Sequence, residues 1–142
     1  MPYHPLGADH AVAPQIAPED LPGFKAAGFT TIICNRPDTE NPVELQADVL
    51  RAAATAAGLA FAENPVVGGG FTMDHIARQA ELMDQSEGKT LAYCASGTRS
   101  AILWAMTQAG TLPTEQIMTT LASAGYNLDG LRAQIDMLAA QK

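Results

Sequence analysis

Residues 91–105 of the chain read LAYCASGTRSAILWA. The apolar residues up to Tyr93 predict a β-strand. The small polar residues at 95–100 predict a loop, and the apolar spacing from Ala101 onward predicts a helix. In such a turn the N–H groups of the loop and of the first helical turn point into one space. The amino end of the helix adds about half a positive charge there. We therefore predict an anion-binding loop, called the cradle below, formed by Ala95, Ser96, Gly97, Thr98, Arg99 and Ser100.

Two side chains of this stretch carry reactive chemistry. Cys94 stands where the strand ends, and the field that binds an oxyanion also favours the thiolate form of a cysteine. The guanidinium of Arg99 is planar and its paired donors suit phosphate, sulfate or thiosulfonate groups. A free cysteine is often only a small buried hydrophobe. The coincidence of Cys94 with Gly97, Arg99 and Ser100 instead predicts a nucleophile above an anion site, with Cys94 and Arg99 catalytic.

Length and composition limit the class of protein. The 142 residues fit one domain, 1–142. A net charge of −7 argues against nucleic acid and anionic membranes as partners. No apolar run approaches the roughly 18 residues of a membrane helix. Two cysteines are too few for a disulfide framework, so a cytoplasmic location is expected.

Strand-like and helix-like segments alternate along the chain. This order predicts an α/β fold with three layers, in which a mostly parallel four-stranded sheet is flanked by helices. The expected strands are residues 10–16, 30–35, 59–67 and 89–93. The expected helices are residues 18–28, 43–57, 71–86, 99–109, 114–124 and 128–140.

Ligands of such sheets bind beyond the carboxyl ends of the strands. Asn35, Arg36 and Asp38 follow one strand, Glu63 ends another and Cys94 a third, so these groups can meet in a pocket. Asp38 and Glu63 are the candidate acids. The alternatives are that Asp38 only forms a turn after proline and that Glu63 is a solvated strand end.

Several stretches resemble one known family. They are VAPQI at 12–16, TIICNRPD at 31–38, YCASGTRS at 93–100 and LWA at 103–105. Together, from about Val12 to Leu128, they resemble the phosphatase-like domain of the bacterial beta-lactamase-hydrolase-like proteins. The resemblance implies a dual-specificity-phosphatase-like, cysteine-phosphatase-like fold and an activity described as phosphatase or sulfurtransferase. It also implies that Asp38 belongs to the loop beside the active site, and that a separate persulfide-metabolising enzyme is a partner.

The length of the cradle favours one of these chemistries. Four residues separate Cys94 from Arg99, as in rhodaneses, whereas cysteine phosphatases have five, and Tyr93 replaces the phosphatase histidine. Because function is decided by the site rather than the fold, the sequence predicts a rhodanese-like sulfurtransferase working through a Cys94 persulfide. The first alternative is a phosphatase that forms a Cys94 phosphocysteine. The second is a non-catalytic oxyanion-binding or redox-regulatory module.

The remaining expectations concern substrates, metals and the second cysteine. The predicted ligands are a small anionic sulfur or phosphate substrate and a thiol acceptor. His4, His10 and His75 lack metal-binding spacing, so neither a metal nor a cofactor is expected. In the resembled fold Cys34 ends the strand beside the one that ends at Cys94, which makes Cys34 a candidate resolving thiol.

Overall fold

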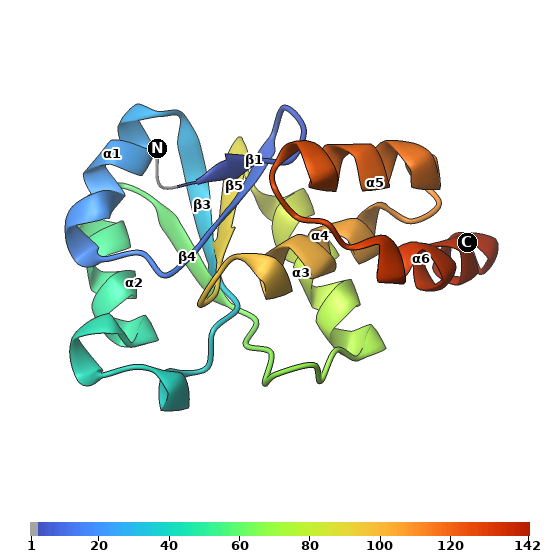
Figure 1. Cartoon of the computed structure of the whole chain (residues 1–142). Coiled ribbons are helices and arrows are strands. Elements are labelled where there is room, and N and C mark those ends of the chain that lie inside the picture. Colours follow the sequence, from blue (N-terminus) through green and yellow to red (C-terminus); the bar gives the residue numbers. More distant parts are fainter. Residues whose placement is uncertain (1–2) are drawn as a thin grey trace.

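A computed structural model describes residues 3–142 of the chain. Its strands form one sheet in the order β1-β2-β5-β3-β4, and every pairing is parallel except that of β1 with β2 (Figure 1). The strands are β1 (His4–Pro5), β2 (His10–Ala13), β3 (Phe29–Cys34), β4 (Ala60–Glu63) and β5 (Lys89–Tyr93). The helices are α1 (Leu21–Ala26), α2 (Ala47–Ala56), α3 (Met73–Gln85), α4 (Thr98–Gln108), α5 (Thr114–Ser123) and α6 (Arg132–Ala140).

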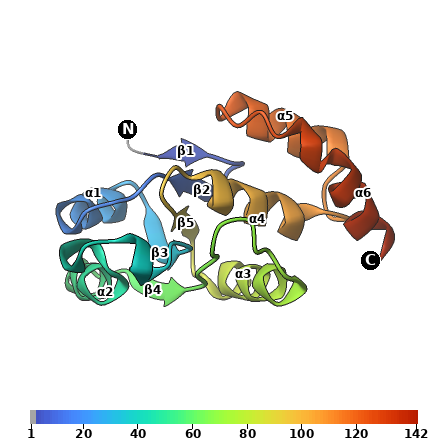
Figure 2. The same cartoon turned by 60° about the horizontal axis from the view of Figure 1, so that its bottom comes forward.

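Helices cover both faces of the sheet, which gives the three expected layers. Figure 2 shows α1 and α2 on one face and α3 and α4 on the other, with α5 and α6 outside α4. Alternate residues of β2 enter different cores, because successive side chains of a strand point to opposite faces. Ala11 and Ala13 pack toward α1 and α2, whereas Val12 packs toward α4 and α5.

The central strand β5 carries the site. It lies between β2 and β3, and its last four residues, from Thr90 to Tyr93, are buried. It ends at Tyr93, as the sequence predicts, and α4 begins at Thr98. The cradle therefore starts at the carboxyl end of β5, the central strand of the sheet.

The predicted fold class is confirmed, but the count of four strands is wrong. The fifth strand, β1, has two exposed residues that pair antiparallel with β2. Two residues that include a proline show no alternation, so the sequence gives no signal for this strand. The expected helices at 18–28, 43–57 and 128–140 each begin with a separate 3-10 turn, at Pro18–Asp20, Val43–Leu45 and Asp129–Leu131.

Within residues 3–142, no helix is both long and apolar enough to cross a lipid bilayer.

Candidate active site

Cys94 lies at the bottom of the cradle. Its Sγ accepts a hydrogen bond of 3.1 Å from the backbone N–H of Gly97, and its own N–H donates to Ala13 O at 3.3 Å. Gln15 also supports the loop, because its backbone N–H donates to Ala95 O at 3.2 Å. The thiol has no exposed surface. A substrate can therefore reach the sulfur only if the cradle or a neighbouring side chain moves.

Gly97 is required at its position for two reasons. Its φ of +92° lies in the left-handed region, which side chains with a Cβ rarely adopt. A Cβ at Gly97 would also lie 2.2 Å from the hydroxyl oxygen of Tyr126. Tyr126 comes from the α5–α6 connection, and its hydroxyl donates to Ser96 O at 3.4 Å. The cradle is thus closed on this side by an aromatic ring.

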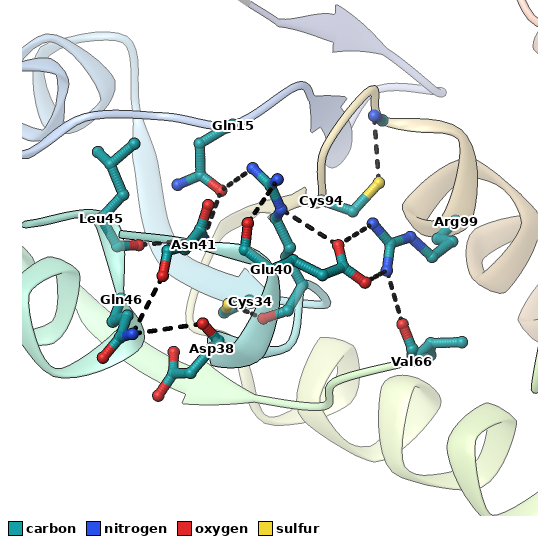
Figure 3. Close-up of polar contacts among 12 residues, drawn as sticks. Gln15, Cys34, Asp38, Glu40, Asn41, Leu45, Gln46, Val66, Cys94 and Arg99 are labelled. Atoms are coloured by element: carbon teal, nitrogen blue, oxygen red, sulfur yellow. Dashed lines mark hydrogen bonds and ion pairs between the residues drawn. The ribbon is translucent and has the colours of Figure 1, made fainter. Parts of the chain in front are cut away.

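Arg99 is held by a carboxylate and a carbonyl. Its Nη1 and Nη2 donate to the two carboxylate oxygens of Glu40, at 2.9 and 2.8 Å, and Nη1 also donates to Val66 O at 2.7 Å (Figure 3). These contacts use three of the five guanidinium N–H groups. The Nε–H and one Nη2–H, on a side chain that lies near the Cys94 thiol, donate to no oxygen or nitrogen of the described residues. They form a second pair of donors, on the edge that Glu40 leaves open.

Charge at the site is locally positive. Glu40 also accepts from Arg36 Nε at 3.2 Å, so two arginines share one carboxylate. The hydrogen bond from Arg99 is the main reason why the pKa of Glu40 is lowered. Glu40 in turn raises the pKa of Arg99, and the nearby Cys94 contributes to the same rise. Arg36, Glu40 and Arg99 together carry a net charge of +1 in an acidic protein, and Arg99 is the member of this group that lies near the Cys94 thiol.

A buried hydrogen-bond network joins the cradle to the sheet. Ser100 Oγ donates to Asn35 Oδ1 at 2.8 Å. Asn35 Nδ2 donates to Asn64 O at 2.9 Å and to Gln79 Oε1 at 3.0 Å. Asn64 Nδ2 donates to the same Gln79 oxygen at 2.9 Å. All four side chains are at most 3% exposed. The network fixes the first turn of α4 against β3, β4 and α3.

The two candidate acids are engaged elsewhere. Asp38 Oδ1 accepts from the N–H of Ala47 at 2.8 Å and so caps the start of α2. Glu63 pairs with Arg51 of α2 at the outer strand β4. The structure places Asn35 against Ser100 and Arg36 against Glu40, the partner of Arg99, whereas Asp38 and Glu63 have other partners. Their roles as acids remain predictions.

Cys34 and Cys94 are both free thiols. Cys34 pairs in register with Tyr93 and shares its face of the sheet, while Cys94 turns its sulfur to the cradle. Cys34 Sγ donates to Arg36 O at 3.3 Å, and burial raises the pKa of this thiol. A protonated, engaged thiol is a poor nucleophile. The resolving role of Cys34 stays a prediction that this arrangement does not favour.

Sequence reasoning missed Glu40, Val66, Gln79 and Tyr126. Glu40 lies two residues after Asp38, in the same polar loop as Arg36. A second carboxylate in this loop was the one feature of the sequence that could have pointed to it. Tyr126 carries no comparable signal, because it follows a helix remote from the cradle in sequence. The His4 ring packs edge-on against it, with 5.7 Å between ring centroids.

The fold and the site together define a cysteine-phosphatase-like domain. The comparisons then give its family: residues 3–111 match the family described as "Beta-lactamase hydrolase-like protein, phosphatase-like domain", and the chain belongs to that family.

A curated relative and two solved structures illustrate the similarity. The beta-lactamase hydrolase-like protein of Xylella fastidiosa is 31% identical over 120 residues, which are 83% of this chain and 28% of that protein. The chain thus spans less than a third of that relative. A Neisseria meningitidis structure provisionally described as a phosphatase has a TM-score of 0.85 and 29% identity, covering 97% of this chain and 99% of its own. The structure of Tk-PTP has a TM-score of 0.77 and 13% identity, and the match covers 99% of this chain and 98% of that one. At this identity the match shows only that the two folds are similar.

Proposed function

We propose that the chain is a cysteine-dependent phosphatase that hydrolyses phosphate monoesters through a Cys94 phosphocysteine. The observation that carries this proposal is the open donor edge of Arg99, held by Glu40 beside the Cys94 sulfur. Membership of a phosphatase-like family supports the same reaction. The comparisons thus favour the phosphatase alternative of the sequence reasoning over its first choice, the sulfurtransferase.

The reaction has two displacements. The Cys94 thiolate attacks phosphorus, the S–P bond forms, and the P–O bond to the ester oxygen breaks with its electron pair leaving on that oxygen. Arg99 and the N–H groups of the cradle stabilise the charge on the three remaining oxygens. Water then attacks phosphorus, a new P–O bond forms, and the S–P bond breaks with its electron pair returning to sulfur. Phosphate leaves, the proton of the water passes to phosphate or solvent, and the thiolate is restored.

The leaving oxygen needs a proton unless it departs as a stable anion. Since Asp38 caps α2 and Glu63 pairs with Arg51, neither acid is free in this arrangement. We therefore expect aryl phosphates to react much faster than alkyl phosphates, because a phenolate leaves with less help from a general acid.

Sulfur transfer is the second candidate, and the four-residue spacing favours it. Here the Cys94 thiolate attacks the outer sulfur of thiosulfate, the S–S bond breaks, and sulfite leaves with the electron pair. A thiol acceptor then takes the sulfur from the Cys94 persulfide. This route needs no proton donor for the leaving group, which suits a site whose carboxylates are engaged.

Parallel assays decide between the two. The chain is given para-nitrophenyl phosphate in one assay and thiosulfate with cyanide in the other. We expect the wild type to release phosphate from para-nitrophenyl phosphate. The Cys94→Ser variant should lose this activity, and the matched variant Cys34→Ser should keep it. Thiocyanate formation dependent on Cys94, without phosphate release, would establish the sulfurtransferase instead. Binding of vanadate with neither reaction would leave an oxyanion-binding module.

A further inference from the structure

Gln15 joins the cradle to the loop that carries Glu40. It is the second residue after β2, and its backbone N–H donates to Ala95 O of the cradle. Its side-chain Oε1 accepts hydrogen bonds from Arg36 Nη1 at 3.2 Å and from Asn41 Nδ2 at 3.1 Å (Figure 3). The segments that follow β2, β3 and β5 therefore meet at this one half-buried residue.

The amide of Gln15 has one favourable orientation at this position. Its Nε2 donates to the carbonyl of Ile16 at 2.8 Å, while donors from Arg36 and Asn41 approach Oε1. An amide oxygen has two lone pairs, whereas an amide nitrogen only donates. Exchanging the two ends would set an NH2 group against the guanidinium of Arg36 and an oxygen against the oxygen of Ile16. The position therefore requires an acceptor between two donors, which glutamine provides.

Arg36 and Asn41 carry this contact to Glu40. Arg36 Nε donates to Glu40 Oε1 at 3.2 Å, and Arg36 Nη2 donates to Glu40 O at 3.1 Å. Arg36 Nη1 donates to Gln15 and to no other residue within 3–142. Asn41, the second donor to Gln15, directly follows Glu40 in the chain. Glu40 is thus held through two polar neighbours, and both of them bind the same oxygen of Gln15.

The position of the Glu40 carboxylate decides which N–H groups of Arg99 are free. Glu40 accepts from both terminal nitrogens of Arg99, and the edge that includes Nε stays open. A paired contact between a carboxylate and a guanidinium keeps the two groups in one plane, so a displaced carboxylate turns the guanidinium with it. Misplacing a catalytic donor by about 1 Å can cost roughly 100-fold in rate. Whatever holds Glu40 therefore also aims Arg99.

We propose that Gln15 is a positioning residue of the anion site, which directs the open donor edge of Arg99 through Arg36 and Glu40. The proposal rests on the proposed function only in assigning an anion to the cradle, since Gln15 itself takes part in no bond-making step. Orthovanadate is the probe, because its binding is measured by calorimetry without turnover.

Removing the acceptor oxygen tests this role. Gln15→Leu keeps the backbone N–H that supports Ala95, so it changes the side chain alone. We expect the Kd for vanadate to rise roughly three- to tenfold, which corresponds to about one net hydrogen bond. Gln15→Ala removes the same oxygen without adding an apolar branch and should give the same result. Gln85→Leu, at an exposed glutamine of α3, is the matched control and should bind vanadate as the wild type does. Wild-type affinity in both Gln15 variants would overturn the proposal.

A double-mutant cycle with Glu40→Gln tests the route of the effect. Independent sites give additive free-energy losses, whereas residues that act through one another do not. In the Glu40→Gln background, Gln15→Leu should weaken vanadate by less than about twofold. Losses that multiply in full would show that Gln15 supports the fold alone, and they would overturn the proposal.

Phosphate release from para-nitrophenyl phosphate is measured on the same proteins. A wild type that binds vanadate but releases no phosphate would contradict the phosphatase alone, and the cycle would still decide the role of Gln15. A wild type that does not bind vanadate would contradict both proposals.

Discussion

Glu40 determines which donors of Arg99 face a substrate. By taking both terminal nitrogens of the guanidinium, it leaves one edge of that group open beside Cys94. Arg36 holds the same carboxylate from the other side. Arg99 binds the anion in the proposed reaction, and Glu40 is a positioning residue that acts through it.

Replacing Arg99 with lysine tests the importance of this geometry. Arg99→Lys keeps the charge but can form neither the paired contact with Glu40 nor the open donor edge. We expect kcat/KM for an aryl phosphate to fall by about 10- to 100-fold, which corresponds to one or two charge-assisted hydrogen bonds. Arg51→Lys, in the ion pair with Glu63, is the control and should change little. Equal vanadate affinity in Arg99→Lys and wild type would remove Arg99 from the anion site.

Glu40→Gln tests the positioning role through pH. Because Arg99 lowers the pKa of Glu40 in the folded chain, the ion pair stabilises the fold above the ordinary carboxyl pKa of about 4.3. That contribution is lost as the pH falls through the lowered pKa. We expect wild type to have a higher Tm than Glu40→Gln at pH 7, and the difference to shrink below about pH 4.3. A Tm difference independent of pH would contradict the role given to this carboxylate. At pH 7 kcat should fall in the variant, with a smaller change in KM.

Elements meet at the cradle in a way that fixes its backbone. Gly97, the residue before α4, has the left-handed conformation and lies against Tyr126, while Ser100 ties the first turn of α4 to β3 through Asn35. The loop is therefore held from above by the α5–α6 connection and from below by the sheet.

Gly97→Ala should lower the free energy of unfolding by more than the cost of placing a Cβ in the left-handed backbone conformation. An added Cβ in that conformation costs about 1–2 kcal/mol, and at Gly97 it also collides with the Tyr126 hydroxyl. Gly125→Ala is a matched control, because Gly125 has a φ of +95° and nothing within 4 Å of the added Cβ. Chemical denaturation should show a clearly larger loss of unfolding free energy for Gly97→Ala. Equal losses in the two variants would mean that Tyr126 does not close the cradle.

Gln79→Leu tests the buried network that joins α3 to the cradle. The leucine would leave the amide groups of Asn35 and Asn64 without a shared partner, at a cost of about 1–3 kcal/mol. Gln85→Leu, on the exposed side of the same helix, should cost less than about 0.5 kcal/mol. Denaturation curves of the two variants give the comparison. A Gln79→Leu curve that overlies that of Gln85→Leu would show that the network adds nothing to stability.

Across the whole molecule, sequence-based prediction succeeded where the relevant residues are contiguous. The strand, cradle and helix from Lys89 to Gln108 are local features, and periodicity with loop chemistry predicts them nearly to the residue. Contacts between distant segments have no such signal. Glu40 and Arg99 are 59 residues apart, and Tyr126 and Ser96 are 30 apart. Asp38 illustrates the same limit, since only the folded chain brings the N–H of Ala47 to its carboxylate.

The most direct test of the account is the mass of the trapped enzyme. The chain is mixed with an excess of aryl phosphate, quenched in acid within the first turnover, and digested for peptide mass analysis. We predict that one phosphoryl group is attached to Cys94 in the wild type and is absent from Cys94→Ser, with Cys34 unmodified in both. A Cys94 peptide that remains unphosphorylated while the substrate is hydrolysed would contradict the account.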